Sequence, residues 1–248
     1  MRARRVRTLA PMAGTGLRER KKQQTYRHVS DIAIGLFLAK GFDAVSVAEI
    51  AATAGISKPT LFRYFPAKED LVLHRFADHE DEAARVVRAA GAEASPVEAL
   101  RRHFLDGLSR EDPVTGLNGS PEVLAFHRLL YGTASLVARA YEYQQRSEAV
   151  LAVALGGTLA ARLAAGQIIA VQRILAQENW RRIAAGETVE AVREDAVAAA
   201  EGAFGQLEAG LPWLGERGAG ADGGGVTAGD RARAGVAVLN SEHGGGEF

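Results

Sequence analysis

The chain has 248 residues, of which 47% are hydrophobic and 24% charged, with 30 basic and 30 acidic side chains. This length and apolar content allow one large or two small folded domains and argue against wholesale disorder. The absence of cysteine excludes disulfides, thiolate metal sites and cysteine nucleophiles. No apolar stretch approaches the roughly 20 residues of a membrane span, and no signal-peptide core follows the basic residues Met1 to Arg7. We therefore expect a cytoplasmic protein with no membrane partner.

The neutral total conceals two unlike parts. Residues 1–80 carry 14 basic and 8 acidic side chains, a net charge of +6, and the rest of the chain balances it at −6. Such asymmetry indicates an N-terminal part that meets a polyanion. A solvated basic tail would have the same composition, so charge alone does not decide between the two interpretations.

Nearly everything between the two ends is predicted to be helical, because Ala, Leu, Glu, Arg and Gln dominate and no run alternates as a strand does. Capping-box spacings at Ser46 and Ser95, and Ser120-Pro121, mark helix starts. The sequence predicts an all-α chain of about nine helices.

Residues 22–65 have the layout of a helix-turn-helix. Apolar residues at helical spacing between Val29 and Phe37 form one inward face, and the capping box at Ser46 opens a short second helix. Gly55-Ile56-Ser57 interrupts the helical pattern, and a third helix begins at Lys58-Pro59. In this layout Gly55 supplies the turn and Ser57 caps the third helix.

The third helix is predicted to bury Leu61, Phe62 and Phe65 and to expose a polar face. Exposed Lys and Arg neutralise phosphates or bond guanine edges, Thr offers a hydroxyl or a methyl, and Tyr donates to a phosphate. A helical hairpin with solvated lysines would not explain this face beside the basic arm that precedes it. We therefore predict DNA contacts from Arg27 of that arm and from residues in or beside the second and third helices: Ser46, Ser57, Lys58, Pro59, Thr60, Arg63, Tyr64 and Lys68.

The run from Thr25 to Phe65, which ends in Gly55-Ile56-Ser57-Lys58-Pro59-Thr60-Leu61-Phe62-Arg63-Tyr64-Phe65, resembles the DNA-binding domain of TetR-type repressors. Val47-Ala48-Glu49-Ile50-Ala51 is similar to that family's second helix, although Val47 stands where some members carry a DNA-contacting Thr. Lys68-Glu69-Asp70-Leu71 matches the segment that follows. The resemblance implies a homodimeric repressor, with three N-terminal helices on DNA and a larger helical domain that binds an effector.

Two long predicted helices, at about 157–185 and 189–209, carry apolar residues on more than one face. One face can serve the domain core and another a partner chain. By the resemblance, two such helices from each subunit form a four-helix dimer interface. Two recognition helices about 34–36 Å apart then occupy successive major grooves.

The effector pocket is expected within predicted helices four to eight. Its candidate residues are large or polar side chains that also fit simple core packing: Phe104, Leu108, Phe126, Leu130, Tyr131, Tyr143, Gln172 and Trp180, with Leu151, His103 and His127 beside them. The segment from Leu159 to Trp180 resembles relatives proposed to sense acyl-CoA-like molecules, which implies a small hydrophobic or acyl-type effector.

No catalytic site is predicted. His74 and His79 are five residues apart, which is wrong for one helix face and a paired zinc site. The acidic run at 78–82 is typical of a solvated helix face, and neither a nucleophile elbow nor a dinucleotide-binding loop is present. We expect no enzyme activity, metal or cofactor.

The sequence thus predicts four parts: a flexible basic N-terminus at 1–17, a helix-turn-helix DNA-binding domain at 18–66, a helical effector-binding and dimerisation domain at 67–210, and a flexible Gly-rich tail at 211–248. The predicted function is that of a sequence-specific DNA-binding transcriptional regulator, a homodimeric repressor released by its ligand. The alternatives are a helical small-molecule-binding protein with a vestigial helix-turn-helix and a non-specific nucleoid protein.

Overall fold

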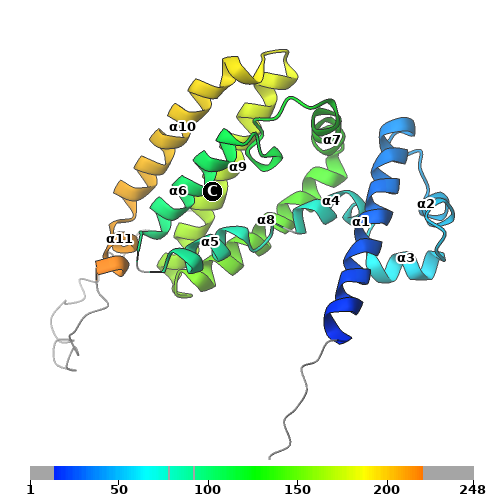
Figure 1. Ribbon diagram of the computed structural model, residues 1–248, viewed down its shortest axis with the longest axis horizontal. Helices are drawn as coiled ribbons and strands as arrows, with labels where there is room; N and C mark the ends of the chain where they lie inside the picture. Colours follow the sequence, from blue (N-terminus) through cyan, green and yellow to red (C-terminus); the bar gives the residue numbers. More distant parts are fainter. Residues whose placement is uncertain (1–13, 78, 92, 220–248) are drawn as a thin grey trace, which may run out of the picture.

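The computed structural model describes residues 14–77, 79–91 and 93–219, and within these ranges the chain is all-helical (Figure 1). The elements in chain order are α1 (Gly14–Lys40), α2 (Val47–Thr53), α3 (Lys58–Tyr64), α4 (Asp70–Ala77), α5 (Glu82–Ala90), α6 (Pro96–Ser109), the 3-10 helix η1 (Pro113–Thr115), α7 (Pro121–Gly132), α8 (Ala134–Ala154), α9 (Leu159–Ala184), α10 (Val189–Gly210) and α11 (Pro212–Ala219). The predicted all-α class is confirmed.

The helix count differs from the prediction at two places. A turn at residues 79–81 separates α4 from α5, although the acidic run at 78–82 is predicted to lie on a helix face. The turn lets Glu80 bond Arg146 of α8 and Glu82 bond His103 of α6. The second difference is α11, which lies inside the predicted tail.

The tail prediction was wrong for its first residues, because Leu211 and Leu214 are buried in the hydrophobic core and α11 packs against α6 and α10. The remainder of that tail, at 220–248, lies outside the described residues. At the other end α1 already begins at Gly14, within the segment predicted to be flexible, and residues 1–13 lie outside the description.

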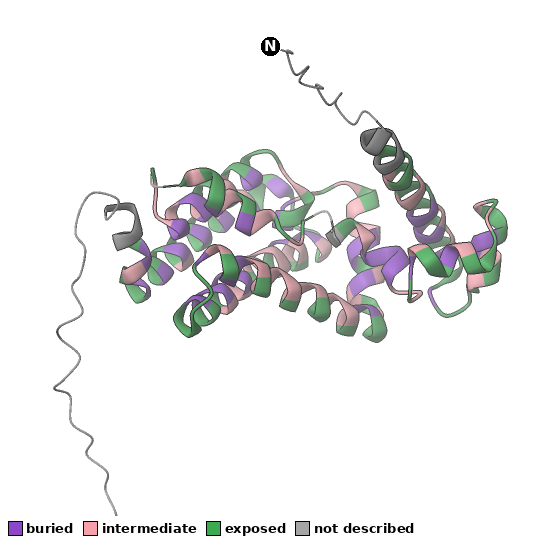
Figure 2. Ribbon diagram, turned by 90° about the horizontal axis from the view of Figure 1, so that it is seen from below, coloured by how far each residue is buried: buried purple, intermediate pink, exposed green. Residues whose placement is uncertain are grey.

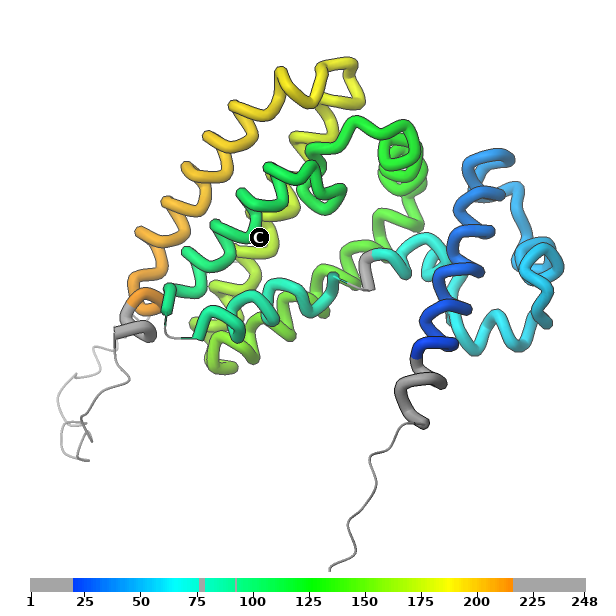
Figure 3. The backbone as a smooth tube through the Cα atoms, in the orientation of Figure 1, coloured from blue at the N-terminus to red at the C-terminus, as the bar shows by residue number. Residues whose placement is uncertain are grey.

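Helices α1–α3 form a small unit, the head, at one end of the molecule, and α4 joins it to the larger helical body (Figures 1 and 3). The hydrophobic core of the head continues into the body. Val29, Ile50 and Leu61 of the head share one cluster with Leu71 of α4 and Leu136 of α8. The domain boundary predicted after residue 66 therefore divides a hydrophobic core.

The body has its own core, formed by α5, α6 and α8–α11. Its buried residues occupy the faces that the helices turn toward one another (Figure 2). Helix α9 packs against α7, α8, α10 and η1. Within the described part of the chain, one helix, α9, is long enough and apolar enough to cross a membrane by length and composition alone. Its residues Ala161, Ala164 and Ile168 are fully buried in the body's core.

The 3-10 helix η1 and the glycine after it form a wall pressed against α9. Asn179 of α9, itself buried, donates a hydrogen bond to the Thr115 carbonyl at 2.9 Å. Gly116 has φ +72°, and a Cβ at this position would lie 1.9 Å from the Ala176 carbonyl oxygen. Only glycine permits this approach.

Candidate nucleic-acid interface and ligand cavity

The turn of the helix-turn-helix is built by two serine caps and a glycine. Ser46 Oγ accepts from the Glu49 N–H at 3.1 Å, and Ser57 Oγ accepts from the Thr60 N–H at 3.2 Å. Gly55 has φ +67°, a conformation that glycine adopts without strain. These caps satisfy N–H groups that the first helical turn leaves open. Ser46 and Ser57 therefore have a structural role as helix caps. The Ser57 hydroxyl oxygen also lies 2.8 Å from the Thr60 hydroxyl oxygen.

Helix α3 exposes the residues predicted to contact DNA. Lys58, Pro59 and Arg63 are exposed, and Thr60 and Tyr64 are half-buried. The Tyr64 ring packs edge-on against Tyr26 of α1, with ring centroids 4.9 Å apart. The structure thus brings the α3 candidates together on one short helix at the surface of the head.

The prediction that Phe62 is buried was wrong. Leu61 and Phe65, four residues apart on one helix face, fill the core at 1% and 2% exposure, whereas Phe62 is 41% exposed. Successive residues of a helix point about 100° apart, so Phe62 cannot share that face. The centroid of the Phe62 ring lies 5.9 Å from Lys58 Nζ. Phe62 therefore places an apolar side chain next to a basic one on the exposed face of α3.

Two other predicted DNA contacts lie apart from α3. Lys68 Nζ donates to the Phe42 carbonyl at 2.5 Å and sits 4.4 Å from the Phe42 ring centroid, so this ammonium holds the loop between α1 and α2. Arg27 is exposed on α1 and lines the cavity described next, together with Ser30 and Asp31.

A cavity of about 580 Å³ lies where the head meets the body. Among the predicted ligand-binding residues, those that line it are Phe104, Phe126, Tyr131, Gln172 and Trp180, with His103 and His127. Leu108 and Leu130 are buried in the cores instead, as is Leu151. Tyr143 lies beneath the Arg146 guanidinium at 4.0 Å and donates to Asp70 at 3.5 Å, outside the cavity wall.

One end of the cavity is aromatic. The Tyr131 and Trp180 ring centroids are 4.8 Å apart, and those of His127 and Trp180 are 5.9 Å apart. Trp180 Nε1 and His127 Nδ1 are buried and have no hydrogen-bond partner. Burial lowers the pKa of His127 to about 4, so its imidazole is neutral near pH 7.

The other end is polar, and two of its central residues, His79 and Glu82, were not among the predicted pocket residues, whereas His103 was. Glu82 accepts from His79 Nδ1 at 2.7 Å and pairs with His103 Nε2 at 3.1 Å. These histidines hold the pKa of Glu82 well below its usual range, and the same carboxylate raises the pKa of His103. Among the described residues, no group of three or more His, Asp or Glu is placed to hold a metal ion.

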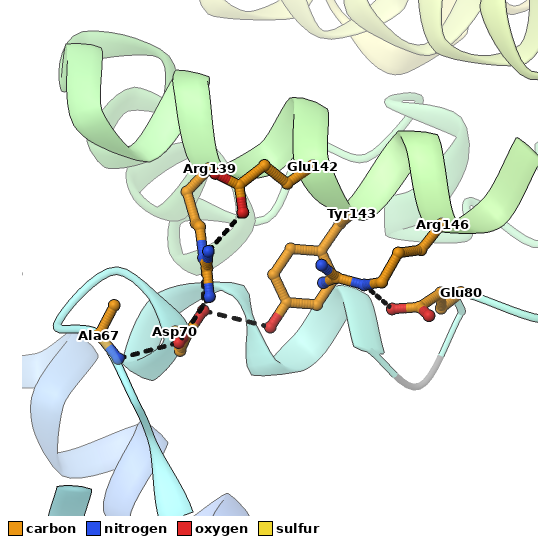
Figure 4. A network of polar contacts seen from close by, with 7 residues as sticks. All are labelled: Ala67, Asp70, Glu80, Arg139, Glu142, Tyr143 and Arg146. Atoms are coloured by element: carbon orange, nitrogen blue, oxygen red, sulfur yellow. Dashed lines mark hydrogen bonds and ion pairs between the residues drawn. The ribbon is translucent and has the colours of Figure 1, made fainter.

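A polar cluster fastens α4 to α8 (Figure 4). The Asp70 carboxylate is buried and accepts a hydrogen bond from the Ala67 N–H at 3.0 Å. It also accepts hydrogen bonds from Arg139 Nε at 2.8 Å and from Arg139 Nη2 at 3.1 Å. Arg139 also pairs with Glu142 on its own helix. Near the other end of α4, Arg146 Nε bonds Glu80 at 2.9 Å. We call these two ion pairs, Asp70–Arg139 and Glu80–Arg146, the α4–α8 clamp.

The buried imidazole of His127 makes stability depend on pH. The unfolded chain binds this proton near the ordinary histidine pKa of 6.5, while the folded chain binds it only near pH 4. The unfolded state therefore holds more protons between these values, and the free energy of unfolding falls as the pH falls through them, by roughly 3 kcal/mol for this group.

Urea unfolding of the wild type and of His127→Phe at pH 7.5 and 4.5 measures this effect. The raised pKa of His103 acts in the opposite direction, giving stability at low pH that is lost as the pH rises, but it is common to both proteins. We expect the variant to lose less stability on acidification. Equal losses in the two proteins would contradict the assignment to His127.

Head, cavity and clamp together define a class of protein: a helix-turn-helix reading domain joined to a helical body with a ligand-sized cavity. Residues 31–74 match the sequence profile described as bacterial regulatory proteins of the tetR family. This match places the helix-turn-helix part of the chain, residues 31–74, in the tetR family of bacterial regulatory proteins.

The proteins that are similar to this chain include two relatives and one solved structure. The HTH-type transcriptional regulator TcmR of Streptomyces glaucescens is 34% identical over 139 residues, which cover 54% of this chain and 59% of that protein. A protein of Mycobacterium tuberculosis, named as the mycofactocin biosynthesis transcriptional regulator MftR, is 47% identical over 60 residues, covering 24% of this chain and 30% of its own length. The match thus spans less than two thirds of either relative.

The solved structure is that of a protein named as a TetR-family transcriptional regulator from Mesorhizobium loti. It has a TM-score of 0.50 at 20% identity and covers 76% of this chain and 97% of its own. This likeness shows a shared fold.

Proposed function

We propose that the chain is a sequence-specific, homodimeric transcriptional repressor that leaves its operator DNA, in the cytoplasm, when a small molecule occupies the cavity. One observation carries the proposal: the cavity is lined both by body residues and by Arg27, Ser30 and Asp31 of α1, the helix on which the reading head is built. A ligand in this cavity therefore contacts the head directly.

DNA binding is supported by the surface of α3. Lys58 and Arg63 are exposed cations on a helix with an ordered N-terminus, and Arg20, Lys21 and Lys22 extend the positive surface along α1. Such a helix suits the major groove, where cations and polar side chains reach phosphates and base edges.

A dimer is supported by an apolar stripe on α9. Leu159, Leu163 and Ile174 are 69%, 60% and 54% exposed, although α9 is otherwise a core helix. Ala198 and Gly202 on the exposed side of the neighbouring α10 would let a partner helix approach closely. We propose that α9 and α10 pair with their copies in a second subunit, which brings two reading heads to one operator.

Release requires a ligand that binds one arrangement of the heads better than the other. The clamp joins α8 to Asp70 at the start of α4 and to Glu80 in the turn that follows α4, so we propose that α4 moves together with α8 when the cavity is filled. The proposed effector is a small molecule with a largely apolar body. An acyl-type molecule fits the volume of this cavity, about 580 Å³.

Gel-shift titration of the purified protein with DNA from upstream of its own gene, and with unrelated duplexes of equal length, tests the proposal. Tighter binding to the upstream DNA supports it. Equal affinity for all duplexes would favour a non-specific nucleoid protein, and ligand binding without any salt-dependent DNA affinity would favour a vestigial helix-turn-helix.

Replacing Leu163 with Glu is expected to dissociate the dimer, because each interface would bury two uncompensated carboxylates. Sedimentation at micromolar concentration should give a monomer, and operator affinity should fall with it. Leu38→Glu is the matched control, since Leu38 is also exposed but lies on α1 of the head. A Leu163→Glu protein that remains dimeric would rule out this interface.

A further inference from the structure

Aromatic rings from three helices meet between α1, α3 and α4. His74 of α4 is stacked on Tyr26 of α1, with ring centroids 4.8 Å apart and planes inclined by 20°. Tyr26 also makes edge-on contacts with α3, because its centroid lies 4.9 Å from that of Tyr64 and 5.2 Å from that of Phe65. These distances lie in the range, roughly 4.5–7 Å, at which aromatic rings attract one another. We call His74, Tyr26 and Tyr64 the aromatic bridge.

One end of the aromatic bridge is part of the cavity wall. His74 lines the cavity, whereas Tyr26 and Tyr64 lie outside its wall. Ser30 follows Tyr26 by one helical turn, and its buried hydroxyl donates a hydrogen bond to the Leu71 carbonyl of α4 at 2.7 Å. Because this bond ties α1 to α4 beside the bridge, a ligand that displaces His74 also displaces Tyr26.

The other end of the bridge carries two cations. Lys22 Nζ lies 5.9 Å from the Tyr26 ring centroid, and the Arg63 guanidinium carbon lies 5.6 Å from the Tyr64 ring centroid. A cation within about 6 Å of a ring is attracted to its face, so the positions of these two cations depend on the positions of the rings. Both are exposed on the head, where they can reach DNA phosphates.

Rings are suited to passing a displacement from one helix to another. An aliphatic side chain can take up a movement by changing its rotamer, whereas a tyrosine ring is rigid and turns about only two side-chain torsions. The Tyr26 ring is also in contact with the rings of His74, Tyr64 and Phe65. Since close-packed side chains transmit strain, a movement of His74 reaches α3 instead of ending at Tyr26.

We propose that the aromatic bridge carries the occupancy of the cavity to the DNA-binding surface, with His74 and Tyr26 as positioning residues for Tyr64 and Arg63 of α3. A ligand that prefers one position of His74 then favours one position of α3. The inference rests on the proposed function. It assigns the bridge a task that the α4–α8 clamp does not have, because the clamp fixes α4 to the body and the bridge fixes α3 to α4 through α1.

Coupling between two binding sites is reciprocal, so DNA bound to α3 must also alter the cavity wall. This makes the bridge testable without a known ligand. The sequence contains two tryptophans, and Trp213→Phe leaves Trp180, which lines the cavity, as the single fluorescent reporter. In this parent protein, DNA from upstream of its own gene should change the Trp180 emission. Half of the change should occur at the DNA concentration that gives half binding in a gel shift.

Variants of the parent protein test the bridge itself. Tyr26→Leu and His74→Leu should still shift the DNA, because Lys58 and Arg63 remain, but they should lose most of the Trp180 response. Tyr26→Phe keeps the ring and should keep the response.

Phe42→Leu is the matched control. The Phe42 ring also lies in the core of the head, where it packs against Phe37 of α1. This variant should be less stable but should keep the response of Trp180 to DNA.

A full Trp180 response in both Tyr26→Leu and His74→Leu would overturn the proposal, and His74→Leu alone decides if Tyr26→Leu does not fold. DNA binding by the parent without any change in Trp180 emission would also overturn it, and so would loss of the response in Phe42→Leu. In each of these cases the gel shift still shows DNA binding, so the proposed function stands. A parent protein that binds no DNA would overturn the proposed function, and the role of the bridge with it.

Discussion

Replacing Lys58 and Arg63 together with alanine should strongly weaken operator binding and make the remaining affinity less dependent on salt concentration. Both side chains are exposed on α3, where their cations can reach phosphates or guanine edges. Each phosphate contact contributes about 0.9 to the slope of log affinity against log salt concentration. In the proposed dimer, losing two contacts from each subunit should reduce that slope by roughly 3 to 4.

Fluorescence anisotropy with labelled operator DNA over a series of salt concentrations measures both effects. Arg102→Ala is the matched control, because Arg102 is an exposed arginine on α6 of the body. Tyr64→Phe tests another predicted α3 contact without disturbing the fold, since it removes the hydroxyl and keeps the ring against Tyr26. An unchanged salt slope in the double variant would refute α3 as the DNA-reading helix.

Replacing Arg139 with alanine should destabilise the protein by about 3–5 kcal/mol, the cost of leaving a buried carboxylate without its partner. Asp70 is only 4% exposed, and Arg139 is the arginine that bonds both of its carboxylate oxygens. Urea unfolding followed by circular dichroism measures the free energy of unfolding.

Arg146→Ala is the control, because it breaks the more exposed clamp pair with Glu80 and should cost only about 1 kcal/mol. In an Asp70→Asn, Arg139→Leu double variant the buried charge is gone, so much of the lost stability should return. If Arg139→Ala and Arg146→Ala reduced the free energy of unfolding by similar small amounts, the buried Asp70–Arg139 pair would contribute no more stability than the exposed pair.

The parts of the structure that depend on local signals could be predicted from the sequence. Ser46, Gly55 and Ser57 fix the helix-turn-helix through caps and one turn, which involve neighbours a few residues apart. Phe62 was misplaced because three large apolar residues in one short helix suggest a wider buried face than the core can accommodate. Which of Leu61 and Phe62 faces inward depends on the position of α1.

The cavity could be predicted only in part, because cavity walls and cores use the same residue types. Phe104 and Leu108 are one helical turn apart on α6, yet only Phe104 reaches the cavity. The polar groups were harder still to predict. Asp70 and Arg139 are 69 residues apart in the sequence and Glu82 and His103 are 21 apart, so no local pattern indicates that they meet.

The shared core of head and body has a consequence for engineering. Chimeric regulators are made by joining the reading domain of one protein to the sensing domain of another. A junction at residue 66 would cut Leu61 and Phe65 away from Leu71 and Leu136, which lie in the same cluster. A transplantable reading unit from this chain must therefore carry α4, and the accepting body must offer apolar side chains where Phe126, Leu130 and Leu136 now lie.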